Sequence, residues 1–198
     1  PVIKKIIDQC GQVTQTFANA ANINPPEKTS FEELAQQVKI VFIALHGRPG
    51  EDGELQLQLN KVGLPFNGSR AESSKITIDK FQTNELLAQN GFKVAQHYKL
   101  TEEEWRNNPS AIEEKIQKEF GFPIIAKPVD DGCSSAVKII RNENQLHAYA
   151  ELIFREDETL NTAAAELLKI KDKEEFPRKR YFLIETLISG ENCKHFLE

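Results

Sequence analysis

The most informative segment of this chain is Phe122-Pro-Ile-Ile-Ala-Lys127-Pro-Val-Asp-Asp-Gly132-Cys133-Ser134-Ser135-Ala-Val137. Its short apolar run between two prolines predicts a buried strand. The strand ends at Lys127, a side chain that is costly to bury without an anionic partner. The turn after it, from Gly132 to Ser135, offers N–H groups and hydroxyls that suit phosphate oxygens. We therefore expect a polyphosphate pocket, with ATP as its ligand; a solvated strand end before an ordinary Asp-Gly turn is the alternative.

On either side of this segment, apolar periodicity predicts helices that alternate with strands. A helix start with acidic residues in its first turn is expected at Thr29-Ser30, and a crossover helix from Leu55. The other predicted helices cover residues 2–20, 78–89, 110–120, 145–155 and 159–169. The other predicted strands cover residues 39–45, 64–68, 92–97, 137–140 and 181–188. This order predicts an α/β fold, with a remnant of an open-sheet domain over residues 1–70.

Composition excludes several classes of protein. The chain is 39% hydrophobic and 28% charged, which is ordinary for a globular protein, and its net charge of −5 does not favour nucleic acid. Its apolar runs are too short to span a bilayer, so no membrane partner is expected. The three cysteines, Cys10, Cys133 and Cys193, have no metal-ligand spacing, and their odd number argues against a disulfide framework. These features favour a cytoplasmic protein.

The start of the chain bears on how it should be understood. It begins at Pro1, contains no methionine and lacks the pattern of a signal peptide. We therefore expect a piece of a longer polypeptide.

Two lysines and a glutamate are candidates for a nucleotide site. Lys80 and Lys127 are point cations that could share the α and β phosphates; for Lys80, local sequence favours the alternative of a surface residue in a first helical turn. Glu185 lies among apolar residues of a predicted strand. It could accept a hydrogen bond from an adenine amino group while the backbone of residues 186–188 meets the ring edge. The solvent face of an alternating strand is the other interpretation.

Two further residues have weaker claims to chemistry. His46 ends a predicted strand and is either a structural hydrogen-bonding residue or a substrate-side group, since strand ends in open α/β sheets bind ligands. The neighbouring Glu51 and Asp52 are expected to make turn and helix-cap hydrogen bonds. Cys133 could be a reactive thiol, but no partner histidine is identifiable, so nucleophilic cysteine catalysis is not favoured.

Several blocks, in order, resemble the D-alanine–D-alanine ligase family of the ATP-grasp superfamily. The resemblance covers residues 38–198 and rests on the His-Gly block Val41–Gly53, the segment Gly63–Ser69, Thr77-Ile-Asp-Lys80, the Lys-Pro strand with its serine loop over Gly121–Ser135, and the hinge Phe182-Leu-Ile-Glu185 with Ser189-Gly190. It implies a small ATP-grasp domain over residues 71–185 and the start of a C-terminal lobe over residues 186–198. It also implies ATP-dependent ligation of two D-alanines through an acylphosphate, for peptidoglycan synthesis, with Mg²⁺ on the phosphates.

The resemblance also assigns roles by position. Lys80 and Lys127 would hold phosphates, and the loop Gly132–Ser135, with Ser134, would close over the triphosphate. Glu185, Leu187 and Ile188 would meet adenine, while His46 would stand near the first D-alanine. Cys133 stands where the family usually has a loop serine, so this position offers a thiol in place of that hydroxyl. Thr186 replaces a frequent lysine, and Asn192 stands where the family has an acidic residue.

Some functional groups of that family fall outside these residues. They are a glutamate for the first D-alanine and the arginine and carboxylates that hold the metal. We therefore expect the isolated segment to be inactive, with no metal ligand in it. Another ATP-grasp carboxylate–amine ligase, or a nucleotide-binding module without catalysis, remains an alternative. Members of the family are commonly homodimers, so a homodimer is the assembly that the resemblance implies.

Overall fold

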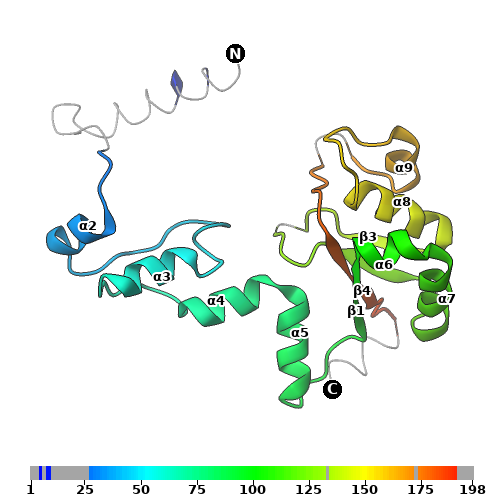
Figure 1. Ribbon diagram of the computed structural model, residues 1–198, viewed down its shortest axis with the longest axis horizontal. Helices are drawn as coiled ribbons and strands as arrows, with labels where there is room; N and C mark the ends of the chain where they lie inside the picture. The colour runs from blue at the N-terminus through cyan, green and yellow to red at the C-terminus, as the bar shows by residue number, and fades with distance from the viewer. Residues whose placement is uncertain (1–4, 6–7, 10–26, 133, 172–173, 191–198) are drawn as a thin grey trace. The chain divides into compact units, whose positions relative to one another are not determined.

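The computed structural model describes residues 5, 8–9, 27–132, 134–171 and 174–190 (Figure 1). The chain divides into two compact units, Pro1–Lys39 and Ile40–Glu198. The helix predicted over residues 2–20 lies almost entirely outside the described residues. The domain boundary predicted near residue 70 stays a prediction.

In the first unit, helix α2 spans Phe31–Gln37 and begins as its sequence predicts. The Ser30 hydroxyl accepts from the Glu33 N–H at 3.1 Å, and the Glu33 carboxylate accepts from the Ser30 N–H at 2.8 Å. This reciprocal pair is a capping box, which satisfies two donors that the first helical turn leaves without partners.

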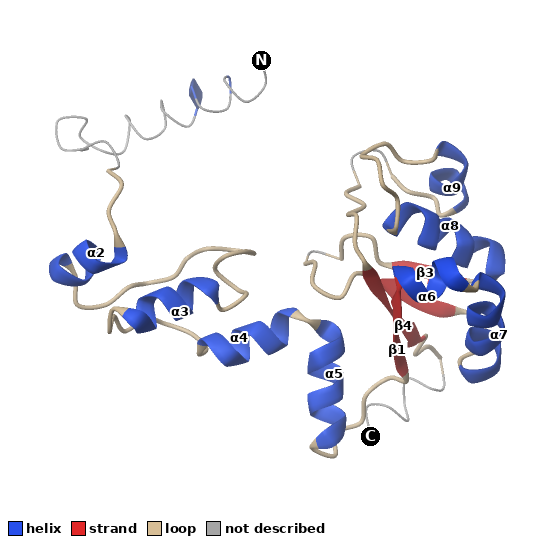
Figure 2. Ribbon diagram, in the orientation of Figure 1, coloured by secondary structure: helices blue, strands red, loops and turns tan. Residues whose placement is uncertain are grey.

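The second unit combines helices with one antiparallel sheet (Figure 2). Its helices in the described residues are α3 Glu54–Lys61, α4 Ala71–Ile78, α5 Lys80–Gln89, α6 Glu102–Asn107, α7 Pro109–Glu119, α8 Glu143–Ile153 and α9 Thr162–Leu167. Its strands are β1 His97–Thr101, β2 Ile124–Lys127, β3 Lys138–Ile140 and β4 Tyr181–Thr186. The α/β class and the strands β2, β3 and β4 are confirmed, with ends that differ by a few residues.

The sheet order is β1-β4-β2-β3, so β4 and β2 are the central strands. In the register of this pair Ile125 lies opposite Glu185 and Lys127 lies opposite Leu183. Residues on one face of paired strands are near neighbours. The sheet therefore brings the end of the Lys-Pro strand beside the predicted hinge glutamate.

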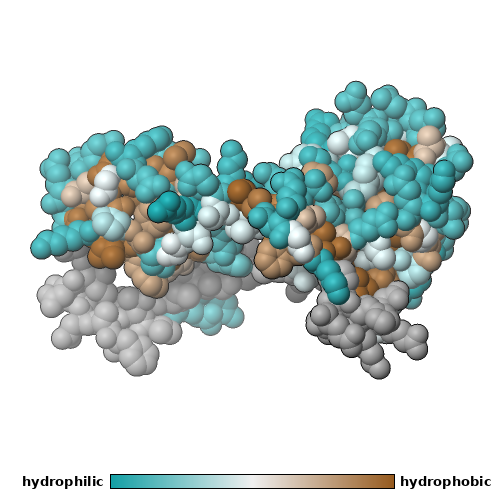
Figure 3. All heavy atoms as spheres, turned by 90° about the horizontal axis from the view of Figure 1, so that it is seen from below, coloured by the Kyte–Doolittle hydropathy of each residue, from teal (hydrophilic) through white to brown (hydrophobic). Residues whose placement is uncertain are grey.

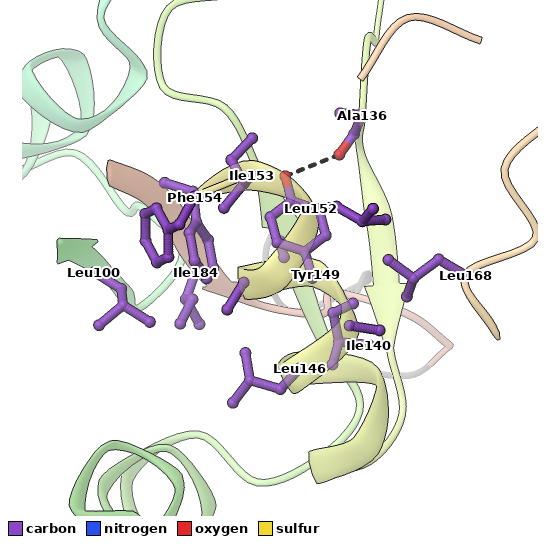
Figure 4. Close-up of a cluster of buried hydrophobic side chains, with 14 of the residues drawn as sticks. Leu100, Ala136, Ile140, Leu146, Tyr149, Leu152, Ile153, Phe154, Leu168 and Ile184 are labelled. Atoms are coloured by element: carbon purple, nitrogen blue, oxygen red, sulfur yellow. Dashed lines mark hydrogen bonds between the residues drawn. The ribbon is translucent and has the colours of Figure 1, made fainter. Parts of the chain in front are cut away.

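The core of the second unit lies where α8 packs on the sheet (Figure 4). Six residues of α8 are buried, and Tyr149 donates its hydroxyl to the Ala136 carbonyl at 3.0 Å. Central members of this core include Leu146, Tyr149, Ile153, Phe182 and Ile184, all fully buried. The burial of this apolar surface makes the sheet a rigid support for the residues at the ends of its central strands.

The strands predicted over residues 39–45 and 64–68 are wrong. They are reduced to one parallel bridge between Val41 and Phe66, and Ile40 and Phe42 are 67% and 78% exposed. The ladder stops after this bridge because the next backbone donor bonds to a side chain. The Ile43 N–H donates to the side-chain oxygen of Asn67 at 2.5 Å, so a side chain replaces the carbonyl that would continue the ladder. The space-filling view in Figure 3 shows that apolar side chains reach the surface on this side of the molecule.

The strand predicted over residues 92–97 is displaced, since β1 begins only at His97. Asn90 ends α5, Gly91 has a φ of 82°, and the Phe92 N–H bonds back to the Leu87 carbonyl at 3.0 Å. Because this helix ending uses the first residues of the apolar run, Phe92 stays 63% exposed.

The helix predicted over residues 78–89 is confirmed as α5, which begins two residues later. A helix that was not predicted, α4, precedes it, and the two meet at Asp79. This residue ends α4 and begins α5, and its carboxylate accepts from the Gln82 N–H at 2.9 Å. Sequence reasoning missed α4 because the segment is largely polar and buries only Ala71 and Ser74. The joint fixes where Lys80, the first residue of α5, lies.

None of the helices in the described part of the chain combines the length and the apolar character that a bilayer crossing requires.

Candidate functional site

Lys127 and Glu185 form an ion pair on neighbouring central strands. The Lys127 ammonium lies 2.6 Å from Oε2 of Glu185, and the two side chains are 20% and 13% exposed. The second carboxylate oxygen accepts from the Asn84 amide on α5 at 2.9 Å. Lys127 therefore has the anionic partner that its position demands, and it does not point into bulk water.

Lys80 is held at both ends by the turn that follows β2. Its backbone N–H donates to the Val129 carbonyl at 2.8 Å, and its ammonium donates to the Asp131 carbonyl at 2.6 Å. Burial and the positive charge of Lys127 lower the pKa of Lys80, while the charges of nearby aspartates act in the opposite direction. An anion placed beside these two lysines would relieve their repulsion, which is the chemistry of a phosphate site.

The loop after β2 has an unusual backbone. Ser134 and Ala136 both have positive φ, 57° and 51°, although neither is glycine. Such conformations cost energy and persist where surrounding contacts hold them. The Ser135 N–H donates to the Gly132 carbonyl at 3.0 Å, and its hydroxyl donates to the Glu175 carbonyl at 3.0 Å. Cys133 lies outside the described residues.

The His-Gly loop is organised by Glu51. The Glu51 carboxylate accepts from the Gly47 N–H at 2.8 Å and lies 3.1 Å from Nδ1 of the exposed His46. The Gly47 N–H and His46 both lower the pKa of Glu51. The Asp52 carboxylate accepts from the Glu54 N–H at 3.0 Å, at the start of α3. The turn and helix-cap roles predicted for Glu51 and Asp52 are confirmed.

An open cavity of about 920 Å³ joins this loop to the turn after β2. Its lining includes His46, Arg48, Lys80, Asp131, Gly132 and Ser135. The other described candidates, Lys127, Ser134, Glu185, Leu187 and Ile188, are not part of that lining. Lys80 links the cavity-lining residues to the Lys127–Glu185 pair, because it borders the cavity and the charge of Lys127 lowers its pKa.

Sequence reasoning missed three contributors to this site: Asn84, the Val129–Asp131 turn and Lys179. Asn84 could have been found, since it lies one helical turn after Lys80 on the same face of α5. The turn and Lys179 could not have been found, because carbonyl ligands have no sequence signature and Lys179 is 48 residues from its partner Asp131.

Within the described residues, no cluster of three or more His, Cys, Asp or Glu side chains could hold a metal ion.

The comparisons with known proteins agree on one family. A model described as the D-ala D-ala ligase N-terminus matches residues 4–69, and one described as the D-ala D-ala ligase C-terminus matches residues 86–166. A D-alanine–D-alanine ligase of Leptospira interrogans is 40% identical over 118 residues, which are 60% of this chain and 33% of that protein. The chain therefore spans about a third of this relative's length.

Two solved structures share the fold. The D-alanine–D-alanine ligase of Bacillus anthracis complexed with ATP has a TM-score of 0.57 at 28% identity, covering 80% of this chain and 43% of that one. The VanG D-Ala:D-Ser ligase of Enterococcus faecalis has a TM-score of 0.56 at 26% identity, covering 77% of this chain and 37% of that one.

Proposed function

Because this chain belongs to the D-alanine–D-alanine ligase family, we propose that it is part of an enzyme that joins two D-alanines with the use of ATP. The product, D-alanyl-D-alanine, would serve peptidoglycan synthesis. The carboxylate of one D-alanine would attack the γ-phosphate of ATP and release ADP, which forms an acylphosphate. The amine of the second would then attack its carbonyl carbon and displace phosphate. Activation is needed because a free carboxylate is a poor electrophile.

One observation carries the nucleotide site. The Lys80 ammonium lies 2.6 Å from the Asp131 carbonyl and borders a cavity that Gly132 and Ser135 also line. Burial and the positive charge of Lys127 lower its pKa. Lys127 ends the central strand β2, and Lys80 begins α5, where its backbone N–H donates to the Val129 carbonyl in the turn after that strand. The cavity, of about 920 Å³, has room for a nucleotide. A polyphosphate would supply compact negative charge beside both ammonium groups.

The roles of the other residues follow from their places. Gly132, Ser134 and Ser135 form a loop that would cover the phosphates, with Cys133 between them. Glu185, Leu187 and Ile188 would face adenine along and after β4. Both carboxylate oxygens of Glu185 have partners, Asn84 and Lys127, so Lys127 would exchange this carboxylate for phosphate when ATP binds. His46, beside Glu51, would stand on the D-alanine side of the cavity.

We include Mg²⁺ in the proposal as the ion that neutralises phosphate charge. The described residues hold no cluster suited to it, so no step of the reaction is assigned through a metal here. We also propose the cytoplasm as its compartment and homodimerisation as its assembly. The domain division at about residues 70 and 185 belongs to the same proposal.

Titration calorimetry with ATP tests the nucleotide site. Wild-type chain is expected to bind ATP, and Lys127→Ala is expected to bind it roughly tenfold more weakly, the loss of a charge-assisted contact. Lys138→Ala is the matched control. Lys138 lies on the neighbouring strand β3 and forms a similarly buried ion pair, 2.6 Å long, with Glu174. No binding by the wild-type chain, or equal loss in both variants, would contradict the proposal.

The VanG relative supports one alternative, a ligase that takes D-serine as its second substrate. Release of ADP by the complete protein with D-alanine alone, compared with D-alanine plus D-serine, distinguishes the two. Binding of ATP without release of ADP under either condition would indicate a nucleotide-binding module.

A further inference from the structure

The Val129–Asp131 turn is the structural support of Lys80. Its carbonyls accept from the Lys80 N–H and from the Lys80 ammonium, as described above, and the Val129 carbonyl lies 3.4 Å from the same ammonium. The direction of the ammonium therefore depends on where these two carbonyls lie.

The turn is itself held by Lys179, which comes from the segment before β4. The Lys179 ammonium lies 2.8 Å from Oδ1 of Asp130 and 3.1 Å from Oδ1 of Asp131. Its backbone N–H donates to the Ile153 carbonyl, at the end of α8, at 2.8 Å. Lys179 thus ties the turn to the buried core. Arg48 provides a second cation, 2.9 Å from the other oxygen of Asp130.

The electrostatics agree with this geometry. Burial lowers the pKa of Lys179, but the bonds and charges of Asp130 and Asp131 outweigh it and the net shift is upward. Burial raises the pKa of Asp130, but Lys179 and Arg48 outweigh it and the net shift is downward. Each partner therefore favours the charged form of the other.

We propose that Lys179 is a positioning residue of the nucleotide site: by clamping Asp130 and Asp131 it fixes the two carbonyls that aim the Lys80 ammonium. The assignment of Lys80 to phosphate rests on the proposed function, whereas the clamp itself does not. Lys179 acts through the turn, because its ammonium contacts the two carboxylates and the carbonyls contact Lys80.

Such a clamp is needed because Lys80 lies near a like charge. The charged groups that face it are Lys127 from β2, Asp130 and Asp131 from the turn, and Asp79 at the start of its own helix. Lys127 repels the ammonium and the three carboxylates attract it. With the turn released, the ammonium would move away from Lys127 and lose its aim into the cavity.

The first experiment measures the titration of Lys80 itself. Reaction of each lysine with a trace amine reagent, followed by peptide mass spectrometry between about pH 8 and about pH 11, gives the midpoint for Lys80. In Lys179→Met the carboxylates lose their compensating cation, so the Lys80 midpoint is expected to rise. In Asp131→Asn one attracting charge is lost, so the midpoint is expected to fall. Lys179→Arg is expected to stay near the wild-type value.

The matched control is Lys138→Met, which removes a comparable ion pair without touching the turn. It is expected to leave the Lys80 midpoint unchanged. In calorimetry, Lys179→Met is expected to bind ATP roughly tenfold more weakly than Lys138→Met.

Two results would overturn the positioning role. One is a Lys80 midpoint and an ATP affinity in Lys179→Met that equal those of the control. If Lys179→Met does not fold, an ATP affinity in Asp131→Asn that equals that of Lys138→Met decides against the clamp instead, because Asp131→Asn breaks the contact with Lys179. Failure of the wild-type chain to bind ATP would remove the proposed function alone, since the titration of Lys80 still tests the clamp.

Discussion

Tyr149 shows what a single polar group does in this core. Its side chain is fully buried on α8, and its hydroxyl donates to the Ala136 carbonyl in the strained segment before β3 (Figure 4). This bond links the core to the loop that contains Ser134. Burial raises the pKa of the Tyr149 hydroxyl well above its usual value, so the group stays a donor at any ordinary pH.

Replacing Tyr149 by phenylalanine is expected to lower the free energy of unfolding by about 1–2 kcal/mol, because the Ala136 carbonyl loses its buried donor. Urea denaturation measures this change. Tyr181→Phe is the control, since Tyr181 is only half-buried at the start of β4. Equal losses in the two variants would show that the Tyr149 hydroxyl adds no stability of its own.

At the scale of elements, the junction between α3 and α4 depends on Gly53. This residue precedes α3 with a φ of 87°, and a Cβ there would fall inside contact distance of the Ala71 carbonyl at the start of α4. Only glycine satisfies both the conformation and the close approach.

Gly53→Ala is expected to destabilise the second unit by about 2 kcal/mol more than Gly63→Ala. Gly63 is the matched control, because its φ is also positive, at 72°, while a Cβ there would meet nothing within 4 Å. The difference between the two urea midpoints therefore isolates the contact with Ala71. Similar midpoints would mean that the junction adjusts freely.

The start of α8 is a second test at this scale. The Asn142 side chain accepts from the Gln145 N–H at 3.0 Å, and the Gln145 side chain accepts from the Arg141 N–H at 2.8 Å. Asn142→Ala is expected to cost about 1 kcal/mol in thermal or urea unfolding. Arg141→Ala keeps both hydrogen bonds and should be nearly neutral. A neutral Asn142→Ala would show that core packing alone sets where α8 begins.

Across the whole molecule, carboxylates with lowered pKa values predict sensitivity to acid. Burial raises the pKa values of Glu104, Asp130 and Glu174, but hydrogen bonds from Thr101, Lys179 and Lys138, respectively, give a net downward shift. Their folded pKa values lie below the unfolded ones. The stability that they contribute is therefore present above about pH 4.5 and lost as the pH falls through the folded values.

The urea midpoint is accordingly expected to fall between about pH 6 and about pH 3. Asp130→Asn should show a smaller fall, because it removes one of these groups. A midpoint that stays constant over this range would exclude the carboxylates as a source of stability.

Most of the second unit was predictable from local patterns. The Lys-Pro strand, its partner β3, the strand β4 and the helices α3, α7 and α8 all follow from apolar period, flanking proline and glycine, and caps. Predictions failed where hydrogen-bond partners, and not apolar periodicity, decide which secondary structure a segment adopts. An apolar run at residues 39–45 forms a single bridge, and a polar run at residues 71–78 forms a helix.

The sequence alone determined which residues are candidates for the chemistry: Lys80, Lys127, the serine loop and the glutamate of β4 are visible as types and spacings. Only the tertiary structure decided their partners. Glu185 is paired with Lys127, Asn84 joins them from α5, and the carbonyls of a turn hold Lys80. The reason is that an ion pair or a carbonyl contact depends on strand register and helix placement, which join residues up to 101 positions apart.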